Sequence, residues 1–202
     1  MPVTDTKNQP AKRGRPGYDQ ETVLNIAVEA FNEHGYDATS MGKLAERLGI
    51  SKSAIYHHVP SKEDLLRLAL DEALIPLEAM VDEVRGHEGT ADERLEFFLR
   101  SAFRILVARR PYVTLLLRLR GNTELERTAL QRRRVLDRQL AELVTLAQSD
   151  GKLRDDLEPR STARLLFGMI NSLVDWYRVD GHLDPDALEE QTIKLLFDGL
   201  HA

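Results

Sequence analysis

Residues 39–62, TSMGKLAERLGISKSAIYHHVPSK, decide how this chain of 202 residues is organised. Their first half carries four apolar residues at helical spacing: Met41, Leu44, Ala45 and Leu48. Gly49 follows at a position where a helix end favours the left-handed conformation. Ser51 has a side chain suited to cap the next helix, and Pro60 ends that helix by forcing Val59 towards an extended conformation. Two short helices joined by a tight turn are typical of a helix-turn-helix unit.

The second of these short helices has two chemically different faces. At about 100° per residue, its outer arc carries Lys52, Ser53, Tyr56 and His57, and its inner arc carries Ala54, Ile55 and His58. The outer groups can bond to phosphate oxygens and to base edges in a DNA major groove. A polar face that only meets solvent is the alternative interpretation of this arc.

The segment resembles the TetR/AcrR family of transcriptional regulators over roughly residues 18–70. The order and spacing of the following residues carry the resemblance: Ala27, Ala30, Phe31, Gly35, Tyr36, Thr39, Ser40, Leu44, Ala45, Gly49, Ile50, Ser51, Ile55, Tyr56, His58, Ser61, Lys62, Glu63 and Leu65. Two departures are small, because Val59 stands where the family often has Phe and Leu44 where Ile is usual. The resemblance implies an all-α fold, with an N-terminal three-helix DNA-binding domain and a C-terminal helical domain.

The resemblance also implies which residues contact DNA. It makes Tyr36, Thr39, Tyr56, His57 and Lys62 phosphate contacts, and Lys52 and Ser53 base readers. Ser40 and Lys43 support them, and Ser51 belongs to the same DNA-binding set. For Tyr36, an aromatic side chain packed in the domain is an equal alternative.

A basic segment precedes the helix-turn-helix unit. Residues 1–17 are polar, contain Pro and Gly, and lack apolar periodicity, so they are expected to form a flexible arm. Arg13 and Arg15 are candidates to enter a DNA minor groove, and the alternative is an ordinary solubilising tail.

Composition excludes several classes of protein. The net charge is −5, but residues 1–62 hold 8 cationic against 7 acidic side chains (+1), and residues 63–202 hold 20 against 26 (−6). The acidic excess therefore lies outside the DNA-binding unit. Without cysteine the chain has neither disulfides nor thiolate metal sites, and no apolar run reaches the length of a membrane span. The lack of cysteine fits a cytoplasmic protein. Catalytic motifs are absent and the six histidines are scattered, so we expect a protein that is not an enzyme and needs no metal or cofactor.

The expected domains are the arm (1–17), the DNA-binding domain (18–65) and a ligand-binding and dimerisation domain (66–202), with about nine helices in total. A long helix from Ser61 joins the last two, and Pro76 either kinks it or divides it into two helices. The basic cluster Arg132, Arg133, Arg134 and Arg138 favours ion pairs on a helix surface over an anion site.

A small-molecule effector is expected in the second domain. Candidate pocket residues are Phe98, Phe103, Arg104, Leu106, Tyr112, Leu116, Arg120, Phe167 and Ile170. The pattern Trp176-Tyr177, Gly181, Leu183 and Pro185 looks like that of members responding to acyl-CoA thioesters, and its alternative is a pair of interface aromatics.

The last two helices carry more than one apolar stripe, which favours a two-fold dimer. Its candidate interface residues are Leu166, Leu173, Trp176, Tyr177, Ile193 and Leu196. The predicted function is a homodimeric repressor that a small molecule, for which an acyl-CoA is a candidate, releases from a palindromic operator in double-stranded DNA. The alternative is a helical binding module without DNA binding.

Overall fold

The computed structural model describes residues 19–178 and 180–201, and throughout these residues every regular element is a helix. The only β-type pairing in the described part is an isolated bridge between Leu153 and His201. The all-α prediction is therefore confirmed. Ten helical segments are present, but α8 (Pro159–Asn171) and α9 (Leu173–Trp176) meet at Ser172 and together form one interrupted helix.

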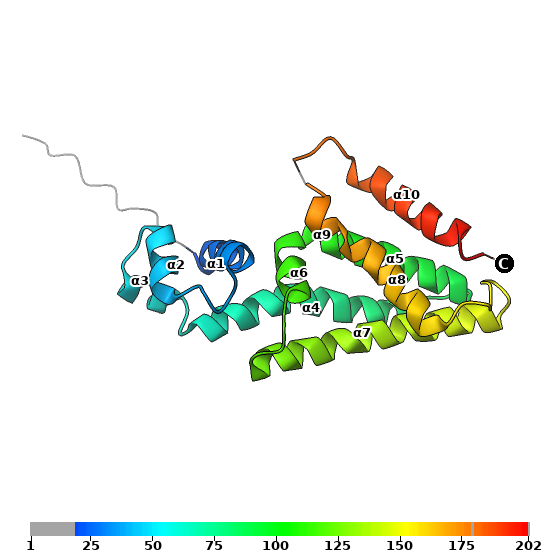
Figure 1. The fold of residues 1–202 in the computed structure, drawn as a ribbon, viewed down its shortest axis with the longest axis horizontal. Helices are drawn as coiled ribbons and strands as arrows, with labels where there is room; N and C mark the ends of the chain where they lie inside the picture. The colour runs from blue at the N-terminus through cyan, green and yellow to red at the C-terminus, as the bar shows by residue number, and fades with distance from the viewer. Residues whose placement is uncertain (1–18, 179, 202) are drawn as a thin grey trace, which may run out of the picture.

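Helices α1 (Gln20–His34), α2 (Met41–Leu48) and α3 (Lys52–His58) form the three-helix unit at one end of the molecule (Figure 1). The turn between α2 and α3 is built as the sequence predicts. Gly49 has a φ of 66°, and its N–H donates to Glu46 O at 2.9 Å while Ile50 N–H donates to Ala45 O at 3.0 Å. This pair of bonds satisfies the last carbonyl groups of α2 and reverses the chain within a few residues.

Local caps begin both helices of the motif. The Ser40 side chain accepts a hydrogen bond from Lys43 N–H at 3.2 Å, and the Ser51 side chain accepts one from Ala54 N–H at 3.1 Å. Leu44 and Ile55 are buried between the helices, at 1% and 0% exposure. The hydrogen bonds set where each helix starts, and the apolar contacts set how the two helices cross.

Helix α4 (Lys62–Gly86) connects the three-helix unit to the rest of the molecule (Figure 1). Ser61 caps it by accepting a hydrogen bond from Asp64 N–H at 3.0 Å. The helix continues through Pro76, so the interpretation of two independent helices is wrong. Its first turns pack on α1, and the remainder packs on α5, α6 and α7. A single helix therefore runs through both domains.

The second domain is a helical bundle. Helices α5 (Ala91–Ala108), α7 (Glu124–Ser149) and α8 pack with α4 around a common apolar core, and α10 (Pro185–Asp198) packs on α5. The short helix α6 (Arg110–Leu117) contacts both α1 and α4. It therefore lies at the boundary between the two domains. No helix in the described residues is long and apolar enough to cross a membrane.

Ion pairs fasten α7 and α10 to the bundle. Arg132 on α7 contacts Asp71 and Glu78 on α4, each at 2.7 Å. On α10, the carboxylate of Glu189 is only 3% exposed and accepts hydrogen bonds from Arg104 at 2.7 and 2.8 Å and from Arg100 at 3.2 Å. A buried carboxylate with these partners anchors α10 in one position on α5. For Arg132, the predicted surface ion pair is confirmed.

Candidate functional site

The outer face of α3 presents polar groups to solvent. Lys52, Ser53 and His57 are exposed, and Tyr56 retains 45% of its accessible surface. On the opposite face Ile55 is fully buried, so the helix cannot rotate without exposing it. The arrangement presents a cation, a hydroxyl, a phenol and an imidazole together, and these groups suit contacts to phosphates and base edges.

The Ser51 hydroxyl caps α3 and also lies 2.9 Å from the Ser53 hydroxyl. Lys43 is exposed and donates to Ala38 O at 3.0 Å. Ser40 and Lys43 thus lie at the beginning of α2, beside the connection from α1. The candidate base readers and their supports occupy the two short helices, as the sequence predicts, while their contacts with DNA remain a prediction.

Thr39 differs from its predicted role. Its side chain is only 2% exposed, and its hydroxyl donates to Gly35 O at 2.8 Å. This placement corrects the interpretation of Thr39 as a side-chain phosphate contact, because the hydroxyl is already used inside the domain. The sequence pattern does not distinguish a threonine that holds a loop from one that faces DNA.

Tyr36 and Lys62 are paired with each other. The Lys62 ammonium donates to Tyr36 O at 2.9 Å and lies 4.2 Å from the centre of the Tyr36 ring, which packs edge-on against Phe31. Burial raises the pKa of the Tyr36 phenol. These contacts tie the first turn of α4 to the loop after α1, so both residues position the DNA-binding unit. Arg13 and Arg15, the candidate minor-groove residues, lie outside the described residues.

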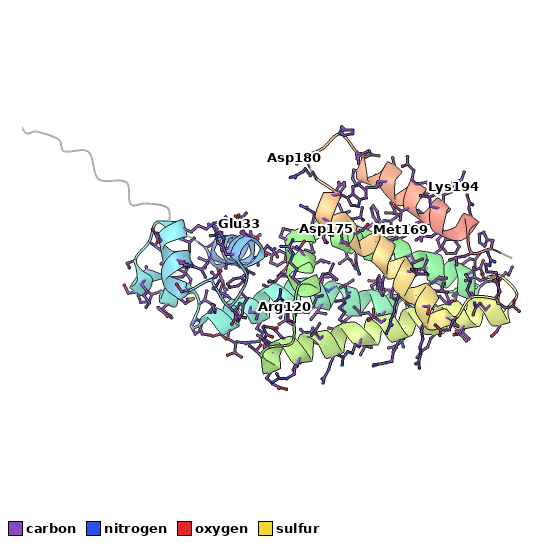
Figure 2. The ribbon with its side chains drawn as sticks, in the orientation of Figure 1. Glu33, Arg120, Met169, Asp175, Asp180 and Lys194 are labelled. Atoms are coloured by element: carbon purple, nitrogen blue, oxygen red, sulfur yellow. The ribbon has the colours of Figure 1, made fainter. Side chains whose placement is uncertain are left out.

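Arg47 holds α2 against α1. Its guanidinium donates to Glu33, labelled on α1 in Figure 2, at 3.0 Å and to Glu29 at 3.2 Å. The hydrogen bond from Arg47 lowers the pKa of the Glu33 carboxyl. Sequence reasoning missed this pair because its members are far apart along the chain.

The boundary between the domains is a set of hydrogen bonds between α6 and α1. The Tyr112 hydroxyl donates to Asn25 Oδ1, and the Asn32 side-chain amide donates to Pro111 O at 2.8 Å. Arg118 donates to Asn32 O at 2.7 Å. Tyr112 is therefore an interdomain contact, and it does not line the cavity described below. Its burial also raises the pKa of its phenol.

A narrow cavity lies in the second domain, among helices α4 to α8. It is lined by Leu77, Ala102, Leu106, Val113, Leu116, Leu117, Arg133, Leu136, Asp137, Phe167, Ile170 and Asn171. The centre of a water-sized sphere can occupy only about 30 Å³ of it. Since one water needs about 10–15 Å³ on this measure, an organic ligand must widen the cavity.

Four of the predicted pocket residues line this cavity: Leu106, Leu116, Phe167 and Ile170. Phe98 and Phe103 are fully buried in the surrounding core but do not line it. Arg104 instead binds Glu189, and Arg120 is exposed in the connection between α6 and α7 (Figure 2). These four residues lie outside the cavity wall, because helical spacing identifies buried faces but not which buried residue borders a gap, and their part in binding an effector stays a prediction.

Asp137 is a polar cavity residue that sequence reasoning missed. It lies on the same face of α7 as the buried Leu140 and Val144, three and seven residues further along, and this helical spacing was the signal that could have identified it. Burial raises the pKa of its carboxyl, while Arg133, Arg164 and Arg134 oppose the rise. Arg133 and Asn171 are the other polar groups of the cavity wall.

The predicted dimer residues are largely internal. Leu166, Leu173, Tyr177, Ile193 and Leu196 are between 2% and 6% exposed within the single chain. The exposed large apolar side chains of α8, α9 and α10 are instead Leu165 (74%), Leu195 (69%), Trp176 (49%) and Met169 (45%). Figure 2 labels Met169 on α8. Five of the six predicted residues thus pack inside the single chain and Trp176 is open to solvent, while the dimer interface itself stays a prediction. The helices carry two apolar stripes, and the sequence does not show which stripe the core takes.

Comparisons with known proteins place both parts of the chain. A family model described as bacterial regulatory proteins of the tetR family matches residues 23–69. A second, described as a tetracyclin repressor-like C-terminal domain, matches residues 88–200. The first match covers the three-helix unit with the start of α4, and the second covers most of the helical bundle.

Related proteins match over nearly the whole chain. A fatty acid metabolism regulator protein of Bacillus subtilis (strain 168) is 27% identical over 193 residues, which cover 94% of this chain and 98% of that protein. The crystal structure of a TetR-family regulator from Streptomyces coelicolor A3 is 48% identical, with a TM-score of 0.83 over 90% of this chain and 92% of that one. AibR, solved in complex with isovaleryl coenzyme A and operator DNA, has the same fold at 24% identity, with a TM-score of 0.72 over 88% and 97% of the two chains.

Proposed function

The chain belongs to the TetR family of bacterial regulatory proteins, and on this premise we propose that it is a homodimeric repressor that a small-molecule effector releases from a two-fold-symmetric operator. It is a DNA-binding transcriptional regulator and not an enzyme. The observation that carries the proposal is the outer face of α3. This face is polar and open to solvent, while Ile55 on the inner face is fully buried.

The exposed apolar side chains on α8, α9 and α10 support a dimer. Leu165, Met169, Trp176 and Leu195 are each at least 45% exposed in the single chain. A two-fold interface would cover them, since a self-complementary patch serves both subunits. Two copies of α3 would then read the two halves of a near-palindromic operator, as in other helix-turn-helix dimers.

The small size of the cavity supports a mechanism of induction. An effector must push the lining helices apart, and α6 supplies Val113, Leu116 and Leu117 to the wall. The same helix holds α1 through the Tyr112 hydroxyl and Asn25. Displacement of α6 therefore moves the DNA-binding unit relative to the bundle. The effector shifts the equilibrium only by its different affinity for the two arrangements.

An acyl-CoA thioester is the effector class that we propose. The cavity wall is mostly apolar and suits an acyl chain. The pattern around Trp176 and Tyr177 resembles that of acyl-CoA-responsive family members, and the Bacillus subtilis relative is named a fatty acid metabolism regulator.

The test begins with selection of operator sequences from genomic fragments, followed by fluorescence anisotropy with cognate and scrambled duplexes. We expect Lys52→Ala to reduce discrimination between the two duplexes by roughly 5- to 160-fold, because a base contact is worth about 1–3 kcal/mol. Tyr56→Phe should weaken binding to both duplexes equally. Lys152→Ala, which removes an exposed cation after α7, is the matched control and should bind as the wild type does.

Octanoyl-CoA is then added to the operator complex and should release the DNA. Absence of any salt-sensitive DNA binding would favour the alternative of a helical module that does not bind DNA. If Lys52→Ala and Tyr56→Phe both bind the two duplexes with wild-type affinity and discrimination, α3 is not the helix that contacts the operator.

A further inference from the structure

A second depression lies beside the cavity, between the middle of α7 and the first turns of α8. We call it the arginine groove. It measures about 630 Å³ and is lined by Arg134, Asp137, Arg138, Ala141, Glu142, Thr145, Glu158, Pro159, Arg160, Ala163 and Arg164. Four guanidinium groups therefore border one groove, two from α7 and two from α8. The sequence separates these pairs by more than 20 residues, so only the fold brings them together.

The arginines of this groove differ from Arg132 in their ion pairing. Among the described residues, none of Arg134, Arg138, Arg160 and Arg164 forms an ion pair within 4 Å. Their neighbour Arg132, in contrast, is bonded to both Asp71 and Glu78. Removal of a groove arginine should consequently leave the packing of the bundle intact.

Two of the three acidic residues of the groove have other partners, and the third, Asp137, faces the charges of Arg164 and Arg134. Glu158 caps α8 by accepting hydrogen bonds from Arg160 N–H at 3.0 Å and Ser161 N–H at 2.7 Å. Glu142 accepts a hydrogen bond from the Gln139 side chain at 2.8 Å. These carboxylates are therefore occupied, whereas the guanidinium groups remain available to an anion that enters from solvent.

Asp137 connects the groove to the cavity, because it lines both. On one side of it the wall is apolar, with Leu136 and Ile170, and on the other side it is basic, with Arg138 and Arg164. A ligand that passes Asp137 would meet an apolar wall at one end and cations at the other. This division matches a molecule with an apolar tail and an anionic head.

We propose that the arginine groove binds the phosphate groups of the effector, and that the effector is an amphiphile with an organic polyphosphate head and an apolar acyl tail. Planar guanidinium groups bind phosphate oxygens in pairs, which gives both affinity and orientation. The inference rests on the proposed function for the tail, since the tail must enter the cavity. The head site is new, and it assigns a role to four arginines that are exposed in the single chain.

The experiment is isothermal titration calorimetry on the full-length dimer, with three probes. Octanoyl-CoA carries head and tail, octanoate carries only a tail, and adenosine 3′,5′-bisphosphate carries only phosphates. We expect octanoyl-CoA to bind at least roughly 10-fold more tightly than octanoate, because hydrogen bonds to charged groups contribute about 1.5–3 kcal/mol each.

The groove variant is R138Q/R164Q. It should weaken binding of octanoyl-CoA and of the bisphosphate by roughly 10-fold or more, and leave octanoate binding unchanged. The matched control is Arg120→Gln, which also removes an exposed arginine without an ion pair but lies before the opposite end of α7 (Figure 2). About 15 Å of helix separates the start of α7 from Arg134. Operator binding by both variants without effector should equal that of the wild type, which confirms that they fold.

Each contrary result has a distinct meaning. If octanoyl-CoA binds wild type and R138Q/R164Q equally, or no more tightly than octanoate, the groove assignment is overturned while an acyl effector stands. If neither the bisphosphate nor any acyl-CoA from four to eighteen carbons binds, both the groove assignment and the acyl-CoA class are overturned. Operator binding is measured separately and shows in either case whether the repressor function survives.

Discussion

Leu195 and Leu196 are neighbours on α10, yet the same substitution should affect dimer association at one position and fold stability at the other. Leu195 is 69% exposed in the single chain and Leu196 only 6%. If the exposed stripe is the dimer interface, Leu195→Ala should weaken association, and Leu196→Ala should destabilise the fold. The pair is its own matched control, because the chemical change is identical at both positions.

The magnitudes follow from these exposures. Complete burial of a leucine side chain contributes about 1.5–3 kcal/mol, so burial of the 69% that remains exposed contributes about 1–2 kcal/mol. A two-fold interface counts each leucine twice, which gives about 2–4 kcal/mol per dimer and a dissociation constant raised by roughly 30- to 1,000-fold. Leu196→Ala removes a core side chain and should lower the free energy of unfolding by about 2–5 kcal/mol.

Sedimentation equilibrium over a range of protein concentrations measures the dissociation constant. Urea unfolding measures stability, and it is repeated at two concentrations because dissociation contributes to the unfolding of a dimer. A dissociation constant within threefold of wild type for Leu195→Ala would refute the interface. The assignment of the two apolar stripes would be reversed if Leu196→Ala weakened association but left the free energy of unfolding of the monomer unchanged.

Three further predictions concern the domain boundary, the cavity and the DNA-binding unit. Tyr112→Phe removes the hydrogen bond to Asn25, so it should lower stability by about 0.5–1.5 kcal/mol and reduce the effector-induced change in operator affinity; an unchanged ratio of affinities by anisotropy would exclude this contact from coupling. Burial raises the pKa of Asp137 above its unfolded value, so the ionised carboxylate lowers the stability of the fold as pH rises through the folded pKa. Asp137→Asn should therefore raise the Tm at pH 7 more than at pH 4. A lower Tm of the variant at pH 7 would contradict the raised pKa of Asp137. Thr39→Val leaves the Gly35 carbonyl without its hydroxyl donor and should cost about 1–3 kcal/mol in urea unfolding, while the dependence of operator affinity on salt stays unchanged; a flatter salt dependence would restore Thr39 as a phosphate contact.

The ends of the DNA-binding helices were predictable because their causes are local. Ser51 accepts its capping hydrogen bond from a residue three positions ahead, and Gly49 takes the left-handed conformation that its position requires. The inner and outer faces of α3 follow from the helical repeat alone. The family resemblance added roles for Lys52 and Tyr56, and their contacts with DNA remain to be measured.

Other features depend on residues far apart in the sequence. Tyr112 is an aromatic residue of the kind that often lines ligand pockets, but its hydroxyl donates to Asn25 across the domain boundary. The basic cluster on α7 divides into two roles, since Arg132 reaches acidic residues on α4 whereas Arg138 faces a groove completed by α8. Neither outcome could be derived from spacing, because the decisive partner lies on another helix.

Local sequence signals were enough to predict an all-α chain, the turn at Gly49 and the solvent-facing arc of α3, since caps, turns and helical periodicity are encoded within a few neighbouring residues. Only the tertiary structure decided that Leu196 is buried while Leu195 remains open, and that four arginines from α7 and α8 share one groove. Both apolar stripes of α10 satisfy the same helical pattern. Packing of distant helices selects between them, and that selection is a property of the whole fold.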